Sequence, residues 1–261
     1  MAEESLPDRP ASSPRRGRLL AVGDIHGCIA ELECLLDAIR PGPEDKLVFI
    51  GDYVDRGRDP RAVIDRLLKL RESSGASCVF LKGNHEDMFL AYLGEKGRYG
   101  DAFLLNGGRT TLASYGLSLE DRGPSVLAAL PPAHVSFLQS LQLYDQDPPF
   151  LFVHAGVAPL RKLEEQEEED LLWIREEFIR NRHLLPFTVV FGHTPQRDVL
   201  WHLPYKIGID TGCVYGNKLS CIDLSDARLL QVERDSGRVT QCDVSKELDA
   251  LESLKESKNR V

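Results

Sequence analysis

Hydrophobic residues along this chain gather in short runs, and a segment with helical spacing follows each of the first three. The runs lie at 18–22, 46–50 and 77–81, and the helical patterns lie near 28–39, 60–71 and 86–93. Strands that alternate with helices in this way predict a mainly parallel inner sheet covered by helices. We therefore expect an α/β fold.

The pattern changes at about residue 94. Residues of about 94–141 read as short helices joined by loops, which predicts a helical cap on the same domain. Apolar runs return at 149–153, 188–191, 206–209, 218–222 and 228–232, with a helix expected around 170–179. Because the late runs are closely spaced, they indicate antiparallel strands in a second sheet. The chain is thus expected to form two packed mixed β-sheets flanked by helices.

The two ends of the chain are polar. Residues 1–17 are rich in Pro, Ser and charged side chains, which predicts a disordered tail. Residues 243–261 are polar and helix-prone, which predicts a surface helix or a frayed end. A length of 261 residues favours one large domain over two small ones, so we expect a single domain over residues 18–242.

Composition narrows the classes of function. The formal net charge of −9, without a local Lys/Arg stripe, opposes binding to nucleic acids. No apolar stretch is long enough to span a membrane, and the N-terminus lacks the hydrophobic core of a signal peptide, so a cytoplasmic protein is expected. The six cysteines form no CxxC pair, which predicts reduced thiols rather than disulfides or a zinc knuckle.

Five of the apolar runs are each followed by a short motif that combines glycine with Asp, Asn or His. The motifs are GDIHG at 23–27, GDYVDRG at 51–57, GNHE at 83–86, HAG at 154–156 and GHT at 192–194. A turn cap explains any one of them, but five in succession favour a site. Because the carboxyl ends of the strands in an open α/β sheet share one edge, these side chains are expected to meet in one cleft. That cleft would gather Asp24, His26, Asp52, Asn84, His154 and His193.

The six side chains offer oxygen and imidazole ligands and no thiolate. Such a set suits hard or borderline divalent ions such as Mn²⁺, Fe²⁺ or Zn²⁺. Six ligands are too many for one catalytic ion that keeps an open position, and are about right for two. A carboxylate can bridge two ions about 3.5–4 Å apart, the spacing that activates a water for attack on phosphorus. Asp52 is the natural bridge.

The ordered motifs resemble those of the phosphoprotein phosphatase family of the metallophosphoesterase superfamily. The resemblance runs from about residue 18 to about residue 224. It is closest to small bacterial and phage members of the phage lambda phosphatase type, on LLNGG at 104–108, LLWIREEF at 171–178 and IDTGCVYGN at 209–217. The GYC-type loop of eukaryotic relatives is absent. The resemblance implies a calcineurin-like metallophosphoesterase fold.

The resemblance also implies which residues bind each metal ion and which residue donates a proton. A first ion would be held by Asp24, His26 and Asp52, and a second by Asp52, Asn84, His154 and His193. His85 would protonate the leaving oxygen, and Asp55 would orient His85. A histidine beside a ligand, with a carboxylate available, suits proton delivery near neutral pH. The alternative for His85 is a structural histidine at a helix N-terminus.

Four residues are expected to contact the substrate, on the same resemblance. Arg56 and Arg175 would bind the phosphoryl group through hydrogen bonds from their planar guanidinium groups. Asn84 and Tyr215 would line the substrate pocket. Arg175 has an alternative as a helix-surface partner of Glu176 or of the acidic run at 164–170. The alternative for Tyr215 is a place in the core.

The function that follows is that of a metal-dependent phosphomonoesterase. The resemblance implies a serine/threonine protein phosphatase, with phosphotyrosine as a further substrate, that uses a hydroxide activated by two ions, first of all Mn²⁺, with Fe or Zn as alternatives. Its partners would be phosphorylated proteins or small phosphoesters, not nucleic acid or membranes. One alternative is a symmetrical dinucleoside tetraphosphate hydrolase, whose family tends towards GDLVARG and GNHD. The other is an inactive binding scaffold, and the oligomeric state is left open.

Overall fold

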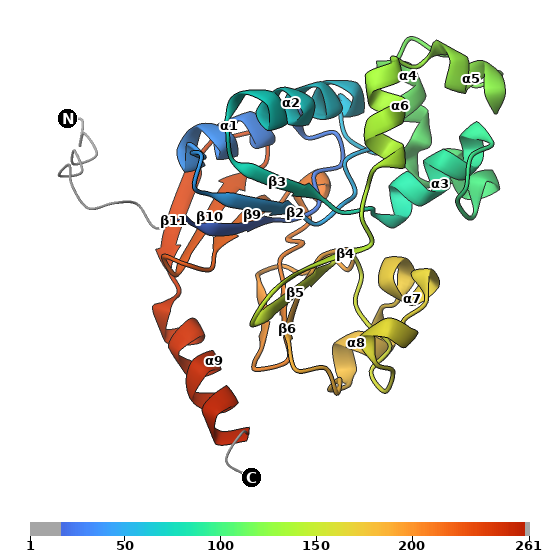
Figure 1. Cartoon of the computed structure of the whole chain (residues 1–261). Coiled ribbons are helices and arrows are strands. Elements are labelled where there is room, and N and C mark those ends of the chain that lie inside the picture. The colour runs from blue at the N-terminus through green and yellow to red at the C-terminus, as the bar shows by residue number, and fades with distance from the viewer. Residues whose placement is uncertain (1–16, 259–261) are drawn as a thin grey trace, which may run out of the picture.

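Two β-sheets face each other in the computed structural model, with helices on both outer sides (Figure 1). The structure describes residues 17–258, so the predicted disordered tail lies, apart from its last residue, outside the described residues. The predicted fold class, two packed mixed β-sheets flanked by helices, is confirmed.

The first sheet has a parallel half and an antiparallel half. Its strand order is β11-β10-β9-β1-β2-β3. The parallel half consists of β1 (Leu19–Val22), β2 (Lys46–Phe49) and β3 (Ser77–Phe80). The antiparallel half consists of β9 (Lys218–Asp223), β10 (Arg228–Glu233) and β11 (Val239–Asp243). The two halves join where β9 pairs antiparallel with β1, with Leu20 opposite Asp223.

The second sheet is parallel in its centre and antiparallel at both edges, in the order β4-β5-β6-β8-β7. The central strands are β5 (Phe150–Val153), β6 (Thr188–Phe191) and β8 (Lys206–Gly208). The edge strands are β4 (Tyr144–Asp147) and β7 (Leu200–His202).

The assignment of strands to sheets differs from the expectation. The late runs at 218–222 and 228–232 extend the first sheet, whereas the runs that end in HAG and GHT belong to the second. The reason is that β9 returns alongside β1, a pairing between distant segments that the spacing of the runs does not reveal. Three strands were missed because β4 reads YDQD, β7 has three residues, and β11 is exposed throughout.

Helices cover the outer faces of both sheets (Figure 1). On the first sheet lie α1 (Ile29–Ile39) and α2 (Pro60–Ser73). At one end lie α3 (Asn84–Leu93), α4 (Arg109–Ser114), α5 (Pro124–Ala129) and α6 (Pro132–Gln139), preceded by the helical turns η1 (Gly100–Ala102) and η2 (Leu104–Gly108). Beside the second sheet lie η3 (Leu163–Glu165), α7 (Glu168–Trp173) and α8 (Glu176–Arg180). The turn η4 (Cys213–Tyr215) precedes β9, and α9 (Ser245–Lys258) follows β11.

Alternating side chains of the strands build three apolar layers. Leu20 and Val22 of β1 pack among α1 and α2, while Ala21 between them faces the second sheet. On the second sheet, Phe152 faces inward and Val153 packs towards α7 and α8. Because both faces of the central strands are buried, their sequences read as continuous apolar runs. The stacked layers hold the ends of β1, β2, β5 and β6 together.

The helix expected around 170–179 is broken in two. After α7 the backbone of Ile174 becomes extended (φ −59°, ψ 141°), and Arg175 caps the start of α8. Just before the break, the ring of Trp173 lies 4.9 Å from that of Tyr99 and 6.4 Å from that of His193. These contacts are tertiary, so the local helical pattern of the segment could not predict them.

The polar C-terminal segment forms α9 up to the last described residues. Leu251 of α9 and Val244 just before it are buried in the apolar layer between the sheets. Within residues 17–258, no helix combines the length and the apolar character needed to cross a membrane.

Candidate active site

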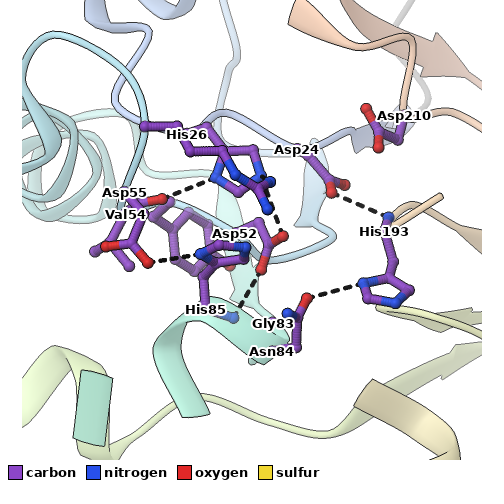
Figure 2. Close-up of polar contacts among 12 residues, drawn as sticks. Asp24, His26, Asp52, Val54, Asp55, Gly83, Asn84, His85, His193 and Asp210 are labelled. Carbon is purple, nitrogen blue, oxygen red and sulfur yellow. Dashed lines mark hydrogen bonds and ion pairs between the residues drawn. The ribbon is translucent and has the colours of Figure 1, made fainter. Parts of the chain in front are cut away.

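The predicted metal ligands lie together where the carboxyl ends of strands from both sheets meet. Figure 2 labels all of them except His154, which contacts Asp52 and Asn84. Asp24 and His26 follow β1, Asp52 follows β2, and Asn84 opens α3. From the second sheet, His154 follows β5 and His193 follows β6. The expectation of one shared sheet edge was therefore wrong, because the site is built from the facing ends of two sheets.

Asp52 contacts both halves of the site. Its Oδ2 lies 3.2 Å from Nε2 of His26, and its Oδ1 lies 3.4 Å from Nε2 of His154. Two groups of ligand atoms share this carboxylate, one with His26 and His85 and one with His154 and His193, and the atoms of each group lie within 4.8 Å of one another. A carboxylate between two such groups has the position of a bridging ligand.

Asn84 and Asp24, the other two predicted ligands, contact these histidines. Oδ1 of Asn84 lies 3.0 Å from Nε2 of His154 and 2.8 Å from Nδ1 of His193. Oδ2 of Asp24 accepts the backbone N–H of His193 at 3.0 Å, so a residue after β1 is joined to a residue after β6 (Figure 2). The two sheets are thus linked at the site.

Two of the histidines are oriented by backbone carbonyls. Nδ1 of His26 lies 2.9 Å from O of Val54, and Nδ1 of His154 lies 3.0 Å from O of Ile50. A carbonyl accepts only from a protonated nitrogen, so each Nδ1 carries a proton, and Nε2 is the nitrogen with which each neutral ring can bind a metal. This is the arrangement of a ligating histidine.

The electrostatics of the site fit divalent cations. Burial, with the charges of Asp210 and Asp52, raises the pKa of Asp24 well above its ordinary value. Burial, with His154 and Arg175, lowers the pKa of His193 well below its ordinary value and keeps the ring neutral. Oδ1 of Asp24 and Nε2 of His193 are buried and have no hydrogen-bond partner in the described part of the chain. Buried carboxylates and neutral imidazoles with free lone pairs are the donors that such ions require.

The turns of the site have unusual backbone geometry. His26, Asp52, Asp55, Arg56 and His193 all have positive φ, between 45° and 71°. Each such residue costs about 1–3 kcal/mol and persists only where its surroundings fix it. Two glycines are required by close approach, since a Cβ on Gly83 would lie 2.2 Å from Oδ1 of Asp52, and one on Gly192 would lie 2.0 Å from Oδ1 of Asp24.

Glu86, in the GNHE motif, fixes these turns and was missed as a site residue. Its Oε2 accepts the N–H groups of Asp52 and Gly83, both at 2.9 Å. Its Oε1 accepts the N–H groups of Tyr53 at 2.7 Å and Val54 at 3.1 Å. One buried carboxylate therefore ties the turn after β2 to the start of α3. A glutamate next to the ligand motif was the signal that could have identified it.

His85 and Asp55 form a buried pair. Nδ1 of His85 lies 2.6 Å from Oδ2 of Asp55, and Oγ1 of Thr111 donates to Oδ1 of Asp55 at 2.6 Å. The N–H of Asp55 donates back to Oγ1 of Thr111 at 2.9 Å. The carboxylate is thus held from two sides, and it contacts Nδ1 of His85 rather than Nε2. Thr111 was missed because it is 56 positions away on α4, in a segment without a motif.

The structure places Arg56 and Tyr215 next to each other at the site. Nη1 of Arg56 lies 2.7 Å from Nε2 of His26, and its guanidinium carbon lies 5.5 Å from the centroid of the Tyr215 ring. Tyr215 is 61% exposed, so the alternative of a core tyrosine is wrong.

Arg175 lies beside the His193 turn rather than in an ion pair with the acidic residues of the described chain. Its Nη1 donates to O of His193 at 3.3 Å. Glu176 pairs instead with Arg180, and residues of the acidic run pair with Arg161, Arg98 and Lys82. Among the described residues no carboxylate forms an ion pair with Arg175, so its alternative as a surface partner has no support in the structure.

Asp210 is a further carboxylate that sequence reasoning missed. It lies near Asp24 in the close-up and is buried (Figure 2). Burial raises its pKa to about 6, although its Oδ1 accepts the N–H of Gly212 at 2.9 Å. The signal was an Asp and a Gly after the apolar run KIGI, the pattern that marked the other ligands.

Comparison with known proteins agrees with this geometry. The sequence profile of the family described as calcineurin-like phosphoesterase matches residues 17–218. The asymmetrical bis(5′-nucleosyl)-tetraphosphatase PrpE of Anoxybacillus flavithermus is 25% identical, over 81% of this chain and 92% of that protein. Serine/threonine-protein phosphatase 1 of Salmonella typhimurium is 30% identical, over 76% of this chain and 88% of that protein.

Among solved structures, a crystal structure of a candidate diadenosine tetraphosphatase is similar to this chain. It has a TM-score of 0.61 and 27% identity, and the match covers 85% of this chain and 95% of that chain. Phosphoester hydrolases of this fold use a dinuclear divalent metal centre, which fits the two ligand groups that share Asp52. Family profile, relatives and site geometry agree that the chain is a metallophosphoesterase and belongs to the calcineurin-like phosphoesterase family.

Proposed function

We propose that this enzyme is a metal-dependent phosphomonoesterase that removes phosphate from phosphoserine and phosphothreonine in proteins. The observation that carries the proposal is the buried pair of His85 and Asp55, fixed by Thr111. An alkoxide leaving group is strongly basic and departs readily only when it is protonated, whereas a nucleotide phosphate leaves without that help. A fixed proton donor therefore suits an alkyl phosphate best.

The residues divide into metal ligands, phosphate-binding groups and the proton donor. Asp24, His26 and Asp52 would hold one ion, and Asp52, Asn84, His154 and His193 the other. When bound, a pair of divalent ions lowers the pKa of a water and offsets negative charge on the phosphoryl oxygens. Mn²⁺ as the metal, with Fe or Zn as alternatives, and the cytoplasmic location stay predictions from the sequence.

The side chains around the ions act directly on the substrate. Arg56 and Arg175 would align the phosphoryl oxygens and stabilise the charge that builds up on them. His85 would give its proton to the seryl or threonyl oxygen as the P–O bond breaks, and Asp55 would stabilise the ring while it is charged. The products would be the free hydroxyl side chain and inorganic phosphate.

A second candidate function is the hydrolysis of dinucleoside tetraphosphates. It is favoured by the likeness to the Anoxybacillus tetraphosphatase along 92% of that protein. The exposed ring of Tyr215 beside Arg56 also offers a face on which a nucleobase could stack. The His85–Asp55 pair would then contribute little to the rate.

One substrate panel separates these functions. The metal-loaded enzyme is assayed with a phosphoserine peptide, a phosphothreonine peptide, p-nitrophenyl phosphate and diadenosine tetraphosphate. We expect the highest kcat/KM with a phosphopeptide. A higher value with diadenosine tetraphosphate would favour the second candidate, and its products, ATP with AMP or two ADP, would tell asymmetrical from symmetrical cleavage. No hydrolysis by a protein with both ions bound would instead indicate a binding scaffold.

A further inference from the structure

Lys206 is a buried cation that the proposed reaction does not use. It begins β8, its side chain is 0% exposed, and within the described residues no carboxylate forms an ion pair with it. Burial lowers its pKa to about 8. A charge that has been removed from water destabilises the fold unless polar groups surround it, so this lysine needs a physical reason for its place.

The ammonium of Lys206 is held by the carbonyl end of α8. Nζ donates to O of Phe178, to O of Asn181 at 2.6 Å and to O of Ile179 at 3.5 Å. It also lies 4.1 Å from the centroid of the Phe178 ring. The last carbonyls of a helix lack partners within the helix and carry partial negative charge. Lys206 satisfies them and attaches the end of α8 to the second sheet.

The other end of α8 lies at the candidate active site. The N–H of Ile179 donates to O of Arg175 at 2.9 Å, and the guanidinium of Arg175 donates to O of His193. Between the two ends, Phe178 packs against the HAG turn so closely that a Cβ on Gly156 would lie 2.3 Å from its ring. The helix therefore connects Lys206 with the turns that carry His154 and His193.

We propose that Lys206 is a positioning residue for Arg175: by holding the carbonyl end of α8, it keeps the guanidinium of Arg175 beside the His193 turn. The inference rests on the proposed function, in which Arg175 binds the phosphoryl group. A helix of five residues has little stability of its own, so its ends must be fixed by other parts of the chain. Without the ammonium, α8 would shift or fray, and Arg175 would lose its place.

The test compares wild type, Lys206→Met, Arg175→Ala and the double variant, all loaded with Mn²⁺. The measured quantities are the inhibition constant of inorganic phosphate, KM and kcat, together with metal content and melting temperature. Arg175→Ala should weaken phosphate inhibition about 10- to 100-fold. Lys206→Met should weaken it roughly 3- to 30-fold with the metal content unchanged. The double variant should be no weaker than Arg175→Ala alone, because both changes remove one interaction.

A matched control removes a lysine that stabilises the fold elsewhere. Lys46 joins the two sheets through Asp145 at 2.8 Å and Asp147 at 3.0 Å, so Lys46→Met should lower the melting temperature and leave phosphate inhibition unchanged. If Lys206→Met does not fold, Lys206→Gln takes its place, because its amide keeps a donor near the carbonyls. Its inhibition constant should lie between those of wild type and Arg175→Ala.

Each outcome bears on one part of the inference. Unchanged phosphate inhibition in the Lys206 variant, with a clear effect of Arg175→Ala, overturns the positioning role and leaves the proposed function intact. Unchanged inhibition in Arg175→Ala overturns both the role of Arg175 and that of Lys206. If wild type hydrolyses no phosphoester, the proposed function fails, and calorimetric binding of phosphate to the same four proteins still decides the role of Lys206.

Discussion

Asp52 is the residue on which both ligand groups depend. Burial acts to raise its pKa, but the neighbouring His154, His85 and His26 hold the pKa well below its ordinary value. The carboxylate is therefore ionised at neutral pH, with one oxygen directed to His26 and the other to His154. A charged group shared in this way cannot be replaced by a neutral one of the same shape.

We predict that Asp52→Asn removes both ions and the activity together. An amide supplies one oxygen without charge, so it can neither bridge two ions nor offset their repulsion. Metal analysis of the purified variant after dialysis against Mn²⁺ checks this. Retention of two ions per chain would show that Asp52 does not bridge them.

His85 supports a prediction that depends on the leaving group. In His85→Asn we expect the metals to stay bound and kcat for a phosphoserine peptide to fall by roughly 10²–10⁴-fold, the range of general acid catalysis. The loss should be much smaller for p-nitrophenyl phosphate, because p-nitrophenolate leaves without a proton. Asp55→Asn should show the same dependence, since Oδ2 of Asp55 lies 2.6 Å from the His85 ring. Equal losses with both substrates would exclude the role of His85 as proton donor.

At the scale of elements, the site depends on turns that are held by bonds from neighbouring elements. The strained turn after β2 is fixed by Glu86 of α3, and the carboxylate of Asp55 is fixed by Thr111 of α4. The second sheet uses α8 in the same way, with Phe178 packed against Gly156. These two turns and the Asp55 carboxylate are therefore held by elements other than the ones that carry them.

The variant Glu86→Gln tests how much the bonds between Glu86 of α3 and the turn after β2 contribute to the free energy of unfolding. The amide nitrogen of Gln cannot accept, so two of the four backbone N–H groups that Glu86 binds would lose their partner. We expect a loss of about 2–5 kcal/mol in the free energy of unfolding, measured with urea. Glu233→Gln is the control, because Glu233 pairs with Arg238 at an exposed site and should cost less than about 1 kcal/mol. Similar losses in both variants would contradict the structural role of Glu86.

At the scale of the molecule, the sequence predicted candidate site residues that directly follow a strand. It did not predict contacts between segments that are distant in the chain. Asp24, His26 and His154 could be identified as candidate ligands because a glycine motif follows an apolar run at each of them. Thr111 could not, because its bond to Asp55 joins positions 56 apart. The division of strands between sheets depends on which edge β9 joins, and the break before Arg175 lies next to the contact of Trp173 with Tyr99. Both are tertiary contacts, which a local pattern does not contain.

The whole fold should respond to the metals, because the site joins the two sheets. Asp24 and Asp52 of the first sheet meet His154 and His193 of the second, and without cations the carboxylates Asp24, Asp52 and Asp210 are buried near one another. Each ion that binds only the folded chain at about 1,000 times its Kd stabilises it by about 4 kcal/mol. For a domain of this size, that corresponds to a melting temperature higher by roughly 10 °C.

The measurement is thermal unfolding of the chelated protein and of the same protein after Mn²⁺ is restored. Asp52→Asn serves as the control, and its melting temperature should not depend on Mn²⁺, because the variant lacks the shared ligand. The direction of the shift follows from linkage: the ligand set comes together only in the folded chain, so ions bind the folded chain and not the unfolded one. A wild-type protein that binds two ions and still melts at the same temperature as its chelated form would mean that the sheets are held together without any contribution from the metal centre.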